Sequence, residues 1–376
     1  MKKIIHGKFI VPDERGNFFI DENKVITFDE KILALDDTDF DAEVIDAENN
    51  FVAPGFINIH IHGCNGFDTM DENISALDEM SKFLPSTGVT SFLPTTMTMT
   101  RSRIVTALKN IRDAKISGAK ILGANLEGPF INESFCGAQD KNCITRADFN
   151  FVNEFSDVIK IVTIAPELLD DFTFIDDCRA KNIIVSIGHS AADYDTAVNA
   201  VNRGATHVTH LFNAQTGLHH RKPGIVGAAL TTSAIVELIA DNVHVHPAAQ
   251  KIVAKVKPRD EIILITDSLR ACGLGEVEGE LGGQKFFVKN NRATLADGTL
   301  AGSVATLNDV VKNFSINAEM KIPAAVEFVT KNPARELKIY ENVGSIEVGK
   351  TADLVIFDEN FNVKQTFING KLIYKN

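Results

Sequence analysis

Eight short runs rich in β-branched and apolar residues, most of them separated by helical patterns, constrain the fold of this chain more than any other feature. The runs lie at residues 56–60, 89–95, 121–127, 159–165, 183–188, 205–210, 235–240 and 261–267. Strands that alternate with helices form parallel βαβ units. Eight such units predict an α/β fold, a (β/α)8 barrel of the TIM type, with a doubly wound open sheet as the alternative.

The two ends of the chain follow a different pattern, in which short β-like runs are broken by turn residues and no helical period occurs. Asn369-Gly370, between two apolar runs, predicts a tight hairpin. We therefore expect a small β-sandwich domain built from residues 1–53 and 344–376, and a barrel domain from residues 54–343. Residues 280–302 are typical of an inserted hairpin.

Composition excludes several classes of function. A formal net charge of −12 over 376 residues argues against general nucleic-acid binding, which requires a basic surface. No segment approaches the roughly 20 apolar residues of a membrane span, and the N-terminus lacks the apolar core of a signal peptide. The five cysteines include no CxxC pair. We therefore expect a cytoplasmic protein that binds neither nucleic acids nor membranes.

Histidines and carboxylates stand at or just after the ends of most of the eight runs. In a barrel of this type the carboxyl ends of the strands meet at one rim, where the active site lies. Imidazoles and carboxylates are also common ligands of zinc and similar divalent metals. The residues concerned are His60, His62, Glu127, His189, His210, His244 and Asp267. These residue types at these places indicate a metal site at the rim.

His60 and His62 lie two residues apart on the first predicted barrel strand, so both rings point to the same face. They could share one metal, although a lone His-x-His pair is equally consistent with ordinary packing. His207 lies three residues before His210 and faces the other side of an extended strand, which assigns His207 to packing and His210 to the site.

Two carboxylates end apolar runs. Burying Glu127 is costly unless it is paired or bound to a metal, and the alternative is a carboxylate hydrogen-bonded to loop amides. Asp267 ends a run that is apolar on both faces, as a buried parallel strand is. Burial and nearby charges can tune its pKa, so Asp267 is a candidate general base.

Residues 219–222 (HHRK) form the densest cationic stretch of this acidic chain. The guanidinium of Arg221 offers a fork that matches phosphate oxygens. The alternative is a solvated loop, but its position after a predicted barrel strand favours capture of an anion.

With these residues in view, the chain resembles the amidohydrolase superfamily, and within it the N-acetylglucosamine-6-phosphate deacetylases. The matching segments are PGFINIHIHG, LEGPFIN, IGHS, THLFNA, RKPGIVGAAL, IADNVHVHP, ITDS, GTLAGS and GSIEVGKTADLVIFD. They extend from residue 54 to the C-terminal region. LEGPF together with THLFNA and ITDS is specific, whereas the first and last segments occur across the wider superfamily.

The resemblance implies roles at the matching positions. Glu127, His189 and His210 would hold a divalent metal, and Asp267 of the TDS motif would be the general acid/base. The positions that match substrate contacts are Gln139, Asn213, Ala214, Arg221, His244, Leu300, Ala301 and Gly302.

The implied cofactor is one divalent cation per subunit, which could be zinc, iron, manganese or cobalt. Some members of the family lack the His-x-His pair, whereas this chain keeps His60 and His62 and could hold a second metal.

The implied reaction is deacetylation of N-acetyl-D-glucosamine 6-phosphate to D-glucosamine 6-phosphate and acetate, by metal-activated water with Asp267 as general acid/base. Arg221 would hold the phosphate of this small-molecule substrate, and His244 the acetyl oxygen. The resemblance also implies a homodimer.

Two alternatives stay open at this point. One is a different deacylase of the same superfamily, acting on N-acyl amino acids or cyclic amides. The other is a barrel retained as a binding scaffold without catalysis, which the full set of predicted ligands together with Asp267 argues against.

Overall fold

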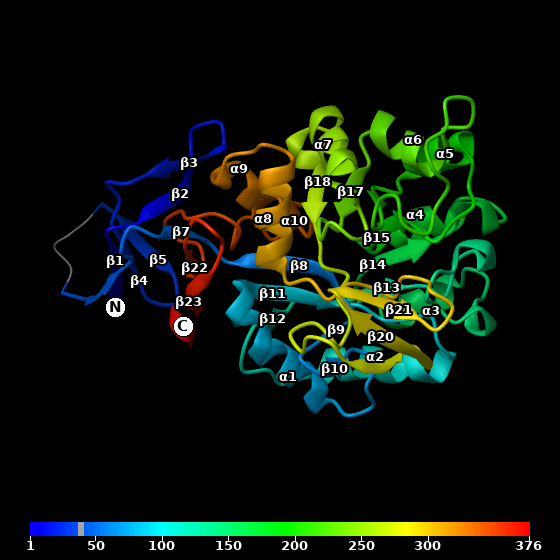
Figure 1. Ribbon diagram of the computed structural model, residues 1–376, viewed down its shortest axis with the longest axis horizontal. Coiled ribbons are helices and arrows are strands. Elements are labelled where there is room, and N and C mark those ends of the chain that lie inside the picture. Colours follow the sequence, from blue (N-terminus) through cyan, green and yellow to red (C-terminus); the bar gives the residue numbers. More distant parts are fainter. Residues whose placement is uncertain (37–40) are drawn as a thin grey trace.

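In the computed structural model, which describes residues 1–36 and 41–376, eight parallel strands form a barrel with helices around it (Figure 1). The barrel strands are β8 (Phe56–Ile61), β11 (Val89–Pro94), β12 (Lys120–Ile121) with β13 (Ala124–Glu127), β14 (Ile159–Ile164), β15 (Ile184–Ile187), β16 (His207–Val208), β17 (Ile235–Leu238) and β18 (Ile262–Leu264). The eight runs of the sequence coincide with these strands, which confirms the predicted barrel.

The barrel closes through two narrow seams. Strands β12, β11 and β8 form one parallel sheet, and β13 to β18 form a second sheet of six strands. Single parallel bridges join the two sheets, between Thr95 and Asn125 at one seam and between Ile61 and Ser268 at the other. The run at 121–127, expected as one strand, is divided into β12 and β13, because the chain bends at Gly123, whose φ is +136°.

Helices cover the outside of the barrel. They are α1 (Ser75–Phe83), α2 (Arg101–Asp113), α3 (Phe149–Glu154), α4 (Thr173–Ala180), α5 (Tyr194–Arg203), α6 (Gly224–Thr231), α7 (Pro247–Val256), α8 (Leu307–Asn317), α9 (Ile322–Glu327) and α10 (Lys331–Glu336). Short 3-10 helices are η1 (Leu84–Thr87), η2 (Glu133–Phe135), η3 (Lys141–Cys143), η4 (Pro166–Leu168) and η5 (Arg259–Glu261). Within the described residues, none of these helices combines the length and apolar character needed to cross a membrane.

Both chain ends contribute to a β-rich part beside the barrel, at the left of Figure 1. One sheet has the order β5-β4-β1-β6 and the other the order β24-β23-β22-β7-β2-β3. The first seven strands are β1 (Lys2–Ile5), β2 (Lys8–Pro12), β3 (Phe18–Asp21), β4 (Ile26–Phe28), β5 (Ile32–Leu35), β6 (Glu43–Asp46) and β7 (Phe51–Pro54). The last three are β22 (Leu354–Phe357), β23 (Val363–Ile368) and β24 (Lys371–Lys375).

A separate apolar cluster fills this β-rich part. Phe28 and Phe367, from different sheets, meet edge to face with ring centroids 5.5 Å apart. The two-residue turn at Asn369-Gly370 has positive φ values of 48° and 70°, the backbone that the sequence Asn-Gly favours. The β-sandwich formed by both termini is therefore as predicted, whereas the boundaries at residues 53/54 and 343/344 stay a prediction.

Two small antiparallel sheets lie over the barrel. One pairs β9 (Gly63–Cys64) with β10 (Phe67–Asp68). The segment expected as an inserted hairpin is a three-stranded sheet of β19 (Glu278–Leu281), β20 (Gln284–Lys289) and β21 (Arg292–Leu295). Gln284 Nε2 donates a hydrogen bond of 2.7 Å to the carbonyl of Ala138, which fixes this sheet to the loop after β13.

A buried glutamate joins the barrel to the β-sandwich. Glu327, the last residue of α9, accepts hydrogen bonds of 2.8 Å from the Phe18 amide at the start of β3 and from Arg259 Nη2. Its other oxygen lies 2.6 Å from Lys331 Nζ, and both side chains of this pair are nearly fully buried.

Replacing Glu327 with alanine leaves the buried Lys331 ammonium without its counter-charge, so we expect the free energy of unfolding to fall by about 3–5 kcal/mol. Glu278→Ala, which removes the exposed partner of Lys285, is the control and should change it by less than about 1 kcal/mol. Denaturant melts followed by circular dichroism measure both variants. Equal losses in the free energy of unfolding of the two variants would contradict a larger contribution from the buried pair.

Candidate active site

A cavity of about 360 Å³ opens at the carboxyl ends of the barrel strands. Most of the residues singled out in the sequence line it, although they come from distant parts of the chain. These lining residues are His62, Glu127, Gln139, His189, His210, Asn213, Ala214, His244, Asp267, Leu300 and Gly302. The folded barrel therefore brings the predicted catalytic, metal-ligating and substrate-binding positions to one place.

Glycines next to Glu127 and His189 allow the backbone to pass close to neighbouring side chains. Glu127 is the last residue of β13, and a Cβ on Gly128, which has φ +76°, would lie 2.0 Å from Thr98 Oγ1. Gly188 precedes His189, and a Cβ there would lie 2.7 Å from Thr209 Cβ. Both positions favour glycine, because a methyl group would collide with a threonine side chain of a neighbouring segment.

Three of the functional side chains sit on left-handed backbone. His189, His210 and Asp267 have φ values of 48°, 30° and 50°. Asp267 is fixed on both sides, since its amide donates to the His60 carbonyl at 3.0 Å and its carbonyl accepts from the Ser303 amide at 2.8 Å. Such conformations cost energy and concentrate where a side chain must be aimed at a site.

One group of converging donors consists of Glu127, His189 and His210. Glu127 Oε1 lies 3.2 Å from His189 Nε2 and 3.0 Å from His210 Nε2, and the two Nε2 atoms are 3.0 Å apart. All three side chains are buried. Two lone pairs at that separation repel each other unless a proton or a cation lies between them, so the group is suited to hold a cation.

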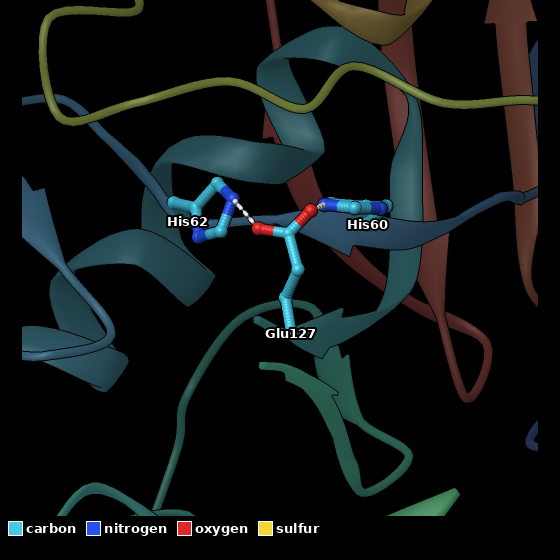
Figure 2. A group of neighbouring side chains, drawn as sticks. All are labelled: His60, His62 and Glu127. Atoms are coloured by element: carbon cyan, nitrogen blue, oxygen red, sulfur yellow. Dashed lines mark ion pairs between the residues drawn. The ribbon is translucent and has the colours of Figure 1, made fainter. Parts of the chain in front are cut away.

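A second group shares the same carboxylate. Figure 2 shows Glu127 between His60 and His62, with one oxygen directed at each ring. His62 Nε2 lies 3.2 Å from Glu127 Oε2 and 3.1 Å from Asp267 Oδ1. His60 Nε2 lies 3.5 Å from Glu127 Oε1 and 3.5 Å from Asp267 Oδ1, and it has no hydrogen-bond partner among the described residues.

Both groups fit divalent metals by their chemistry. Four imidazoles and two carboxylates converge in a buried cluster, and this is the ligand type that zinc and its neighbours in the periodic table prefer. His62 and His189 direct Nδ1 at the carbonyls of Thr95 and Phe135, at 3.1 and 2.9 Å. In the tautomer that donates these bonds, each Nε2 lone pair faces the cluster, as a metal ligand requires.

The electrostatics of the cluster keep its carboxylates ionised. Burial raises the pKa of Glu127, but the imidazoles of His60 and His189 hold it well below its usual range. Burial also raises the pKa of Asp267, while His60 and His62 lower it to about 2. Burial lowers the pKa of His210, whereas its hydrogen bond to Glu127 raises it to about 9. A cation that enters the cluster therefore replaces protons.

Two of the predicted substrate-binding residues, Gln139 and His244, have different hydrogen-bond partners. Gln139 Nε2 donates to Glu127 Oε2 at 2.5 Å, and its Oε1 accepts from the Thr98 amide at 2.6 Å. His244 directs Nδ1 at Asp241 Oδ2, 2.7 Å away, and its ring also lines the cavity. Gln139 therefore holds the Glu127 carboxylate in place, and Asp241 orients the His244 ring.

Three of the predicted residues do not line the cavity. His60 is fully buried beneath it, and Ala301 is also buried, so only its neighbours Leu300 and Gly302 face the space. Arg221 is exposed, with Nη1 2.6 Å from His220 Nε2. Within one chain nothing brings the guanidinium of Arg221 into the cavity, so its contact with phosphate stays a prediction.

The sequence reasoning missed several residues of the site. Glu237 lies 2.9 Å from His60, and the signal for it was an acidic residue inside the apolar run 235–240. Asp241 could have been found from its spacing of three residues before His244. The apolar wall had no such signal, and it consists of Met97, Phe135 and Leu281.

His207, assigned to packing, lies outside the cavity. It is fully buried on β16, and its Nδ1 is 3.5 Å from Glu336 Oε1 on α10. His207 on β16 thus faces the helices, whereas His210, in the turn that follows the strand, lies in the cluster of possible metal ligands.

Comparison with known proteins agrees with this architecture. The model of the amidohydrolase family matches residues 51–373. The N-acetylglucosamine-6-phosphate deacetylase of Bacillus subtilis is 40% identical over 346 residues, which cover 89% of this chain and 87% of that protein. The N-acetylgalactosamine-6-phosphate deacetylase of Escherichia coli O157:H7 is 33% identical over 380 residues, 99% of each chain.

A solved structure has the same fold over its whole length. The N-acetylglucosamine-6-phosphate deacetylase of Pasteurella multocida superposes with a TM-score of 0.94 at 28% identity, covering 100% of both chains. Because the family model spans most of the sequence and these relatives match nearly end to end, this chain belongs to the amidohydrolase family.

Proposed function

We propose that this protein deacetylates N-acetyl-D-glucosamine 6-phosphate, giving D-glucosamine 6-phosphate and acetate, with a divalent cation in the cavity. The observation that carries the proposal is the convergence of Glu127, His189 and His210 on one point, with Asp267 beside them. Relatives that act on N-acetylglucosamine 6-phosphate support the choice of substrate. The E. coli relative favours one second candidate, the galactosamine epimer.

The cation would be held by Glu127, His189 and His210, and a second by His60, His62 and Glu127. A divalent metal in such a site polarises an amide carbonyl and acidifies water. Zinc, iron, manganese and cobalt all suit these ligands, and availability decides among them.

Asp267 performs the proton transfers of the reaction. Its carboxylate is ionised and lies at the edge of the cluster, in the cavity lining. It takes a proton from the attacking water as the oxygen bonds to the acetyl carbon. It then delivers that proton to the amide nitrogen as the C–N bond breaks, which releases the amine and acetate. His244, oriented by Asp241, binds the acetyl oxygen while negative charge develops there.

The phosphate would be bound by the cationic segment 219–222, with Arg221 as its principal donor. This segment is exposed in one chain, which agrees with a place near the interface of a homodimer. Asn213, Ala214, Leu300 and Gly302 would contact the sugar from the cavity wall. The reaction consumes a phosphorylated metabolite, and we place the enzyme in the cytoplasm.

Release of acetate from N-acetylglucosamine 6-phosphate tests the proposal directly. We expect turnover with the purified protein, loss of turnover after chelation, and recovery when a divalent metal is added back. The galactosamine epimer and unphosphorylated N-acetylglucosamine serve as comparison substrates. Absence of acetate release by the metal-loaded protein would rule out the proposed reaction.

Asp267→Asn is expected to fold and bind metal but to lose about 10²- to 10⁴-fold in kcat, because an amide cannot accept the proton of the attacking water. Acetate release at saturating substrate measures kcat, and metal analysis of the same sample is the control. Turnover near that of the wild type would remove Asp267 from the chemistry.

Metal uptake should depend on pH through His210. Its pKa is raised to about 9, so below that pH the ring is protonated in the metal-free protein, and the proton must leave before a cation binds. We therefore expect apparent affinity for Zn²⁺ to rise between about pH 6 and about pH 8. Calorimetric titration in two buffers of different ionisation enthalpy measures the proton release, and affinity that is independent of pH would contradict this assignment.

A further inference from the structure

The barrel interior holds a third carboxylate, which neither the metal-ligating groups nor the proton transfers use. Glu237 lies on β17, and its side chain is fully buried. Its Oε2 is 2.9 Å from His60 Nδ1 and 3.4 Å from the backbone nitrogen of His210. Its Oε1 has no hydrogen-bond partner among the described residues. A charge buried this deeply is costly to keep and calls for a reason.

His60 differs from the other imidazoles in the partner of its Nδ1. His62 and His189 direct that nitrogen at backbone carbonyls, and His210 Nδ1 has no partner in the part of the chain that is described. Among the four rings of this cluster, His60, His62, His189 and His210, only His60 directs Nδ1 at a carboxylate. In the tautomer that donates from Nδ1 to this carboxylate, the Nε2 lone pair of His60 faces Glu127 and Asp267.

We propose that Glu237 is a positioning residue that fixes the tautomer and orientation of the His60 ring, and thereby enables His60, His62 and Glu127 to hold a second cation. The inference rests on the metal centre of the proposed function, and it adds a residue outside the set of ligands. Figure 2 shows both rings directed at the Glu127 carboxylate.

The charges of the cluster support the same conclusion. Glu127, Asp267 and Glu237 are three carboxylates in one buried region. Their contacts in the described chain are with imidazoles, the Gln139 amide and backbone groups, and none is with lysine or arginine. Carboxylates that no lysine or arginine neutralises attract cations, and three ionised carboxylates with neutral imidazoles still carry one net negative charge after a first divalent cation has bound.

The experiment follows metal binding rather than turnover. Full-length protein is stripped with a chelator and titrated with Zn²⁺ in competition with a chromophoric chelator, and bound metal is counted by elemental analysis. We expect wild-type protein to bind two equivalents. Glu237→Leu removes the hydrogen-bond acceptor and keeps a similar side-chain volume. It should lower the affinity for the second equivalent of Zn²⁺ by about 10- to 100-fold and leave the affinity for the first unchanged.

Two further variants separate the hydrogen bond from packing. Glu237→Gln can still accept from His60 Nδ1 through its amide oxygen, so it should weaken the second equivalent by less than about tenfold. Glu327→Gln, at a buried glutamate remote from the cavity, is the matched control and should bind both equivalents as the wild type does. If Glu237→Leu does not fold, Glu237→Met takes its place with the same expectation.

The His60→Asn background tests whether Glu237 acts through that ring. In that background the protein no longer binds the second equivalent of Zn²⁺, and adding Glu237→Leu should leave the affinity for the first equivalent unchanged. The proposal is overturned if wild-type protein binds a single equivalent, if Glu237→Leu binds both normally, or if the first equivalent weakens in this background. Acetate release is measured alongside, and failure to turn over with intact metal binding contradicts the proposed reaction but not this inference.

Discussion

The Glu127 carboxylate is the interaction on which the site depends. One of its oxygens faces His189, His210 and His60, and the other faces His62 and Gln139. A single buried anion thus collects side chains from four other segments of the chain. Without it the imidazoles would lack a common acceptor, and their burial would carry an unopposed cost.

Closing the barrel and assembling the site are the same event. The seam between the first and last strands is a single bridge, Ile61 to Ser268, and the adjacent hydrogen bond from the Asp267 amide to the His60 carbonyl aligns both residues at the cluster. Because β18 closes against β8 at this point, Asp267 can reach His60 and His62 only in the closed barrel. The left-handed backbone of Asp267 is tolerated there since Ser303 holds it from the other side.

Local sequence patterns predict the residues at the floor of the site well, but they predict other parts of the structure less completely. Strand alternation and the position of a residue at a strand end are enough to place Glu127, His210 and Asp267 at one rim, because parallel strands end together. Glu237 was missed because a single acid in an apolar run carries no local mark of its partner, His60, which is 177 residues away. The location of Arg221 depends on how an exposed loop packs, and that is not encoded by its own charge. The division of the run at 121–127 follows from the bend at Gly123, whose positive φ a glycine permits but does not require.

The floor and the wall of the cavity are built by different kinds of structure, and this separates chemistry from selectivity. The residues that could hold a metal stand on or shortly after barrel strands, where their side chains are buried. The wall above them comes from connecting segments, with Leu281 from the inserted sheet, Phe135 from η2, and Leu300. Loops tolerate substitution and insertion far better than barrel strands do. Changes of the acyl or sugar group that is accepted can therefore arise in the wall while the hydrolytic floor stays intact, which is how one barrel supports many amide hydrolyses.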